Sequence, residues 1–263
     1  MPLIASLKKS LTKLFLIFTL SAISLPAHSS PSRTLTILAE QNMAVALTKI
    51  ARVYSQISNV IVSVNFGTSY DLVNAVDSGD PSDLFISAHE SSIETLKQKG
   101  LVDVYNIGYI ASDNITLATD KRNLNAGVIF KPESSLEEAL QVLNQKKAAL
   151  IIDNEDTSSG MICNNYLKPF SLDRVRLIKK LPEDKTPIVK IIKNNPQHYA
   201  LMLSSQSANN ENLDIIATKE NIGTFYQALV IAGNNMEVAR EFVKFLKGKD
   251  ATKIFRESGF VAN

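Results

Sequence analysis

The stretch LTILAEQNMAVALTKIARVYSQISNVIVSVNFGTSYDLVNAV, residues 35–76, contains one local pattern twice. In each copy a short apolar strand (35–39, then 60–66) passes through a polar turn into an amphipathic helix, which begins near residue 43 or near residue 70. Such a turn directs the unpaired backbone N–H groups of its helix toward the edge of the sheet. Two such turns side by side predict a pocket for a small, anionic solute.

The rest of the chain continues to alternate strands and helices. Strands are expected at 84–87, 115–118, 148–152, 199–204, 213–218 and 225–232, and helices at 91–99, 136–143, 161–166, 187–193, 237–247 and 251–257. This order predicts an α/β fold of two lobes, each a mainly parallel sheet flanked by helices. We expect residues 30–112 with 220–263 in the first lobe and residues 113–219 in the second. Two lobes joined by several crossings suit closure around a ligand.

The N-terminal segment, residues 1–29, has the pattern of a cleaved secretory signal peptide. Lys8, Lys9 and Lys13 precede an apolar run at 14–25, and Ala27-His28-Ser29 is a small-x-small cleavage site. The apolar run is shorter than the roughly 20 residues that a membrane-spanning helix needs. Without these three lysines the chain has 25 of its 28 basic residues against 26 acidic ones. This near-balance argues against a nucleic-acid partner, which usually requires a basic surface.

Enzyme motifs are missing from the sequence. Only His89 and His198 remain once the signal peptide is removed, and we expect both to be polar residues near turns, with His198 exposed. No G-x-S-x-G elbow, HExxH helix or P-loop occurs, and no His/Cys cluster suggests a metal. Cys163 is the only cysteine and is expected to be a buried apolar residue. The sequence therefore predicts a protein without catalysis, cofactor, metal site or internal disulfide.

The block GDPSDLFISA, residues 79–88, resembles the strand entry of the periplasmic molybdate-binding proteins that serve ABC importers. The segment FGTS at 66–69 and the C-terminal residues 242–260 fit the same family. The resemblance implies a two-lobed periplasmic-binding-protein clamshell, monomeric and located in the periplasm. It also implies that the ligand is a tetrahedral oxyanion, molybdate or tungstate above all, which is handed to a permease in the inner membrane.

By position, the resemblance implies ligand-binding roles for Asn42, Thr68, Ser69, Ser159, Gly160, Lys185 and Ser204. Ser69 falls on a serine of the family and equally suits the N-cap of the helix near residue 70. Asn42 stands where the family usually has serine, and Lys185 is alternatively a surface residue. Leu203 replaces a tyrosine whose hydroxyl meets the anion, and Ser204 or Ser205 could compensate.

Glu40 is the main departure from the family pattern, because it replaces a small residue beside the first turn. A carboxylate next to a buried dianion is unfavourable unless it points away or is protonated. We therefore expect Glu40 to be solvated at the rim of the cleft. Three alternatives stay open: a protonated oxyanion whose proton Glu40 accepts, a small organic solute, and a sensor or scaffold role outside transport.

Overall fold

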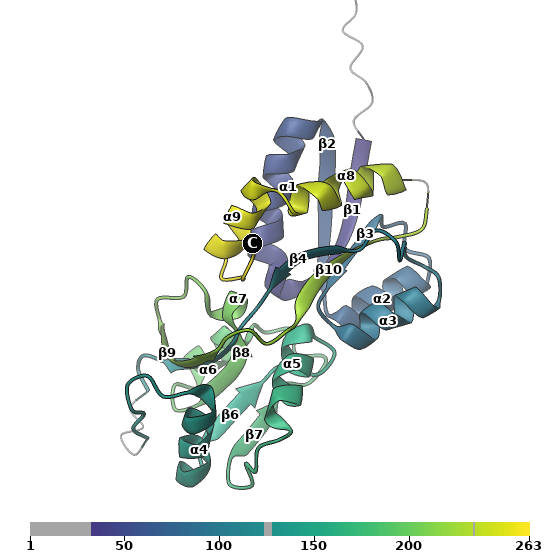
Figure 1. Ribbon diagram of the computed structural model, residues 1–263. Helices are drawn as coiled ribbons and strands as arrows, with labels where there is room; N and C mark the ends of the chain where they lie inside the picture. Colours follow the sequence, from purple (N-terminus) through teal and green to yellow (C-terminus); the bar gives the residue numbers. More distant parts are fainter. Residues whose placement is uncertain (1–32, 124–127, 234) are drawn as a thin grey trace, which may run out of the picture. The chain divides into compact units, whose positions relative to one another are not determined.

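The computed structural model describes residues 33–123, 128–233 and 235–263 (Figure 1). The predicted signal peptide lies outside these residues. Within them, no helix is long and apolar enough to cross a membrane, and no group of three or more His, Cys, Asp or Glu side chains is placed to hold a metal ion.

The described residues form two five-stranded sheets, which define the two lobes. The first lobe contains β1 (Arg33–Glu40), β2 (Val60–Gly67), β3 (Leu84–Ser87), β4 (Gly108–Ser112) and β10 (Phe225–Val230), with η1 (Gln41–Met43), α1 (Ala44–Ser58), α2 (Ser69–Asp77), α3 (Glu90–Gln98), α8 (Met236–Leu246) and α9 (Lys249–Glu257). The second lobe contains β5 (Ile115–Asp120), β6 (Ala149–Ile152), β7 (Arg176–Lys179), β8 (Tyr199–Leu203) and β9 (Leu213–Lys219), with α4 (Leu136–Lys146), α5 (Ser158–Leu167), α6 (Ile188–Asn194) and α7 (Ser204–Ser207).

Each sheet is mainly parallel, as predicted. The first has the order β2-β1-β3-β10-β4, and only β10 runs against its neighbours. The second has the order β7-β6-β8-β5-β9, and only β5 is reversed. The chain passes between the sheets from β4 to β5 and returns from β9 to β10. The two-lobed α/β fold is therefore confirmed.

Helices cover both faces of the first sheet (Figure 1). Along β1, Leu35 and Ile37 face the core cluster that contains α1, α8 and α9, while Leu38 faces the cluster with α2 and α3. This alternation follows from the two-residue period of a strand. Because β1 and β2 are parallel, their carboxyl ends lie at one edge of the sheet, where the polar turns begin.

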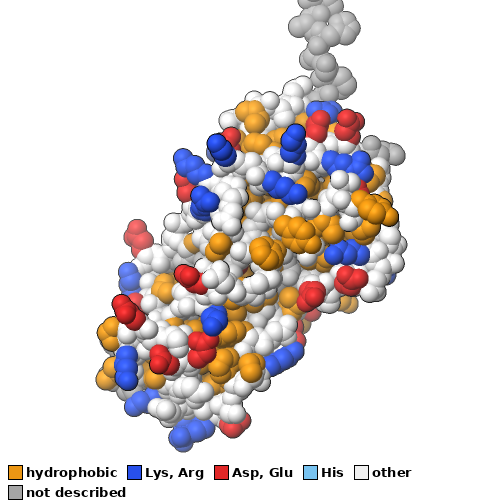
Figure 2. Space-filling view, viewed as in Figure 1, with side chains coloured by type: hydrophobic (Ala, Val, Ile, Leu, Met, Phe, Trp, Pro, Cys, Tyr) orange, Lys and Arg blue, Asp and Glu red, His pale blue; other side chains and the backbone are white. Residues whose placement is uncertain are grey.

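Three short elements were not expected from the sequence: β4, β7 and α7. The strand β7 lies at a sheet edge with most of its residues exposed, so it lacks an apolar run. The segment at 199–204 ends as a strand at Leu203 because Ser204 begins α7. The helix expected at 161–166 is longer, since α5 begins at Ser158. Figure 2 shows acidic and basic side chains interspersed over the face in view, in keeping with the near-balance of charge.

Candidate functional site

The first turns of α2 and α5 come from opposite lobes and are capped in the same way. Thr68 Oγ1 accepts the backbone N–H of Asp71 at 3.1 Å, and Thr157 Oγ1 accepts that of Gly160 at 3.0 Å. The cap of α2 is therefore Thr68, and the prediction that Ser69 caps it is wrong. Because Ser69 is the first residue of α2, its hydroxyl is free to point elsewhere.

Glu40 occupies the point where these two turns meet. Its side chain is buried, with 3 % of the residue exposed, so the expectation of a solvated rim position is wrong. Its Oε1 accepts hydrogen bonds from Ser69 Oγ, from Ser87 Oγ at 2.5 Å and from Ser158 Oγ at 2.5 Å. Ser69 and Ser87 belong to the first lobe and Ser158 to the second. Three hydroxyl donors thus replace the water that the carboxylate loses on burial.

A small cavity of about 30 Å³ adjoins this cluster, which is room for about one or two water molecules. It is lined by Glu40, Gln41, Asn42, Gly67, Thr157, Ser159 and Gln206. Among the described residues, the backbone N–H groups of Ser69, Ser158 and Ser159 have no hydrogen-bond partner. Of these three residues Ser159 lines the cavity, while Ser69 and Ser158 stand at the helix starts beside Glu40 and outside its lining.

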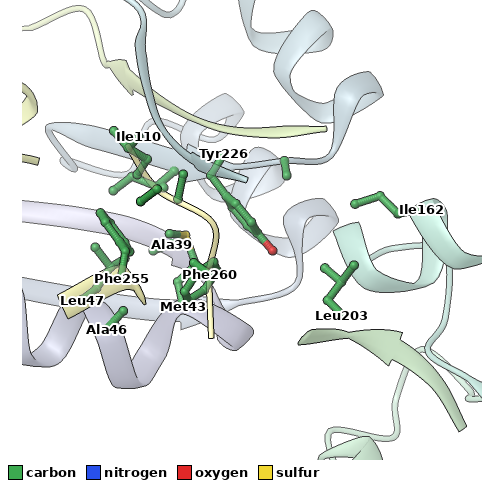
Figure 3. Close-up of a cluster of buried hydrophobic side chains, with 14 of the residues drawn as sticks. Ala39, Met43, Ala46, Leu47, Ile110, Ile162, Leu203, Tyr226, Phe255 and Phe260 are labelled. Carbon is green, nitrogen blue, oxygen red and sulfur yellow. The ribbon is translucent and has the colours of Figure 1, made fainter. Parts of the chain in front are cut away.

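Asn42 lies in η1, directly after β1, and lines the cavity. Its Nδ2 donates to the hydroxyls of Tyr226 and, at 3.3 Å, of Ser205, while its Oδ1 is buried without a partner among the described residues. Figure 3 shows the Tyr226 side chain extending from β10 with its hydroxyl end toward Leu203 and Ile162 of the second lobe. The phenol hydroxyl that contacts Asn42 therefore comes from Tyr226, a residue that the sequence analysis did not identify.

The buried hydroxyl of Tyr226 is a neutral group. Burial raises the pKa of Tyr226 well above its ordinary value, and the nearby carboxylates of Asp113 and Glu40 raise it further. Tyr226 is therefore protonated at neutral pH, and its hydroxyl can donate as well as accept.

Ser159 lines the cavity, and Gly160 stands directly behind it. Ser159 Oγ donates to Gln206 Oε1 at 2.7 Å, within the second lobe. A Cβ on Gly160 would lie 1.7 Å from the backbone oxygen of Asn154, so only glycine allows the loop to pack this closely against α5. Gly160 thus shapes the start of α5 and does not itself line the cavity.

Lys185 does not lie at the cavity. It is exposed and forms a 2.8 Å ion pair with Asp71 of α2, which lowers the pKa of that carboxyl group. The buried cation of the region is Lys180, whose Nζ lies 2.9 Å from Asp153. Gln206 Nε2 donates to the same carboxylate at 2.8 Å. Lys180 follows the unpredicted strand β7, so no pattern in the sequence marked it as buried.

Ser204 is also engaged away from the cavity. Its Oγ lies 2.6 Å from Asp113 Oδ1 and 2.8 Å from the backbone oxygen of Gly259. Asp113, between β4 and β5, is buried, and burial raises its pKa to about 6. Ser204 and Asp113 therefore connect the segment that crosses between the lobes, from β4 to β5, with the C-terminal segment at Gly259.

The two histidines have structural partners. His89 Nδ1 accepts the backbone N–H of Ser92 at 3.3 Å and caps α3, which leaves Nε2 to donate to the Glu155 backbone oxygen at 2.9 Å in the other lobe. His198 is buried beside Arg176, so its expected exposure is wrong, and burial with this cation lowers its pKa. Cys163 is fully buried, as predicted.

Comparison with known proteins agrees with this geometry. The model of the bacterial extracellular solute-binding proteins matches residues 35–261. The chain belongs to this family. It is 21 % identical to the Escherichia coli molybdate-binding protein ModA over 230 residues, which cover 86 % of this chain and 88 % of that protein.

Solved structures share the fold at low sequence identity. The periplasmic molybdate-binding protein of Azotobacter vinelandii has a TM-score of 0.65 and 16 % identity, with 87 % of this chain and 99 % of that one covered. PEB3 of Campylobacter jejuni in complex with L-phospholactate has a TM-score of 0.64 and 18 % identity, with 87 % and 100 % covered. The resemblance to periplasmic molybdate-binding proteins inferred from residues 79–88 is thereby confirmed, and the fold is that of a solute-binding protein.

Proposed function

We propose that this chain is the periplasmic binding component of an ABC importer, which captures a small oxyanion between its lobes and delivers it to a membrane permease. The observation that carries the proposal is the meeting of α2 and α5 at Glu40, with one helix N-terminus from each lobe. A helix N-terminus carries about half a positive charge and several free N–H donors. Two such ends suit an anion that has lost its water.

Neutral donors hold the anion in this proposal. No Lys or Arg is among the described residues that line the cavity, and Lys180 and Lys185 are already paired, with Asp153 and Asp71 respectively. The unused N–H group of Ser159, which lines the cavity, is the first donor to the anion, and those of Ser69 and Ser158 at the adjoining helix starts join it as the lobes move. The binding partners of the related proteins named above, molybdate and L-phospholactate, are both oxyanions.

The present arrangement is the closed state of the lobes. The cavity has room for about one or two water molecules in this arrangement, so a tetrahedral oxyanion enters it only when the lobes part. The polar contacts between the lobes that this motion has to break or carry along include Ser158 to Glu40, the Tyr70 N–H to Asp156, His89 to Glu155, Asn42 to Ser205, and the exposed pair of Lys185 with Asp71. Ser204 and Asn209 of the second lobe also bond the C-terminal segment.

A thermal-shift panel tests the proposal. The exported chain, unfolded and refolded to remove any bound solute, is heated with phosphate, arsenate, sulfate, molybdate or tungstate. A ligand at 100 times its dissociation constant adds about 2.7 kcal/mol to the free energy of unfolding. Ser69→Ala is expected to reduce this gain, whereas Ser134→Ala, at an exposed loop residue of the second lobe, leaves it unchanged. The absence of a shift with all five anions contradicts the proposal.

A further inference from the structure

Glu40 brings a negative charge into the site proposed for an anion. All three of its described hydrogen bonds go to Oε1. Its Oε2 accepts none from the described residues, and Glu40 lines the cavity. This leaves Oε2 as an acceptor open to a bound solute.

No cation compensates this carboxylate. None of the ion pairs between described residues includes Glu40. Its charge is instead balanced by three hydroxyls and by the N-termini of α2 and α5, where Ser69 and Ser158 stand. The groups that would solvate an incoming anion therefore already solvate one negative charge.

Glu40 Oε2 interacts differently with oxyanions that carry a hydrogen and with those that carry none. Sulfate, molybdate and tungstate carry no proton near neutral pH, so their oxygens meet Oε2 as like charges at short range. Phosphate and arsenate keep at least one hydrogen, which Oε2 can accept in a charge-assisted hydrogen bond. Asn42 does not discriminate between the two kinds of oxyanion. A 180° rotation of its amide group exchanges the acceptor Oδ1 for the donor Nδ2.

We propose that Glu40 is a specificity-determining residue, which selects oxyanions that carry a hydrogen over those that carry none by accepting that hydrogen on Oε2. The inference rests on the function proposed above and narrows its ligand to the phosphate type, either the inorganic anion or a monoester in its singly protonated form. It moves the ligand away from molybdate and tungstate, because neither carries a hydrogen that Oε2 could accept.

Isothermal titration calorimetry at pH 6 tests the selectivity of the unmodified protein. The ligands are inorganic phosphate, arsenate, methyl phosphate, sulfate and molybdate. We expect phosphate and arsenate to bind at least 100-fold more tightly than sulfate and molybdate, since a site built around a ligand hydrogen rejects analogues that lack it. Methyl phosphate binding as tightly as phosphate assigns the site to monoesters, and its exclusion assigns it to the inorganic anion.

Glu40→Gln tests the residue itself. The glutamine oxygen can still accept from the three serines, while its amide group places a donor where Oε2 was. We expect phosphate affinity to fall at least 10-fold and sulfate or molybdate affinity to rise at least 10-fold. Glu94→Gln, an equal change of charge at an exposed position of α3, leaves both unchanged.

The outcomes separate the two proposals. If sulfate or molybdate binds the unmodified protein as tightly as phosphate, the role of Glu40 is overturned and oxyanion capture stands. The same holds if phosphate is preferred and Glu40→Gln leaves that preference intact. If none of the anions binds, the proposed function itself fails. If Glu40→Gln does not fold, the selectivity of the unmodified protein can still overturn the role of Glu40.

Discussion

Ser158 Oγ of the second lobe lies 2.5 Å from Glu40 Oε1 of the first lobe. This hydrogen bond joins the start of α5 to the end of β1 through a buried carboxylate. It places the charge of the first lobe at the helix N-terminus of the second, so the closed arrangement depends directly on Glu40.

Ser158→Ala removes this link. A hydrogen bond to a charged group contributes about 1.5–3 kcal/mol, so we expect a loss of that size in the free energy of unfolding. Urea denaturation followed by circular dichroism measures it. Ser134→Ala, which removes an exposed hydroxyl bonded to the Lys131 backbone oxygen, is the control and is expected to cost less than about 0.5 kcal/mol. Equal losses in the two variants contradict the role of Ser158.

Substitution of each of the two lysines near the site is expected to affect the free energy of unfolding very differently. Lys180→Met leaves the buried carboxylate of Asp153 without its cation, and breaking such a pair costs about 3–5 kcal/mol. Lys185→Met breaks an exposed pair with Asp71, where the median contribution is about 0–1 kcal/mol. Chemical denaturation of both variants gives the comparison. A Lys180→Met variant as stable as Lys185→Met refutes the assignment of Lys180 as the buried cation.

The raised pKa of Asp113 predicts that the stability of the protein depends on pH. Burial raises its pKa to about 6, so between about pH 4 and pH 6 the native state holds a proton that the unfolded chain has released. The free energy of unfolding therefore falls as the pH rises through this window and is level above it, a contribution of about 3 kcal/mol in total.

Asp113→Asn is expected to remove this slope and to stabilise the protein at pH 7, since the amide can still accept from Asn114 and Ser205. The measurement is the difference between its denaturation curves and those of the unmodified protein from pH 4 to pH 8. Asp214→Asn, at an exposed position of β9, serves as the control. Parallel curves for Asp113→Asn and the unmodified protein rule out this role.

Gly160→Ala tests the close approach at the start of α5. The new Cβ would lie 1.7 Å from the Asn154 backbone oxygen, so the loop before α5 must move. We expect destabilisation at or above the upper end of the roughly 1–3 kcal/mol that overpacking usually costs, together with weaker anion binding. Gly233→Ala, where a Cβ meets nothing within 4 Å, provides the comparison. Thermal unfolding with and without ligand gives both quantities.

Local patterns in the sequence predict most of the elements because the core residues lie within single helices and strands. The spacing of Leu47, Ile50 and Tyr54 predicts α1, and all three side chains are buried. The strand β7 could not be predicted in this way, because an edge strand such as Arg176–Lys179 buries too little to show an apolar pattern.

The site was harder to predict than the fold, because its contacts connect distant segments. The sequence placed Asn42 and Ser159, which line the cavity, by analogy with known turns. The burial of Glu40 depends on Ser69, Ser87 and Ser158, which lie 29, 47 and 118 residues away along the chain. No local pattern reports such a convergence, and a lone glutamate in a turn is ordinarily solvated.

We propose that an oxyanion binds where the first turns of α2 and α5 meet. Crystals grown with saturating arsenate test this proposal, because anomalous scattering locates the arsenic atom. We expect a single peak within hydrogen-bonding reach of the Ser69 and Ser159 backbone N–H groups, with one arsenate oxygen on Glu40 Oε2. Absence of a peak between the two helix starts, or a peak confined to another part of the molecule, contradicts it.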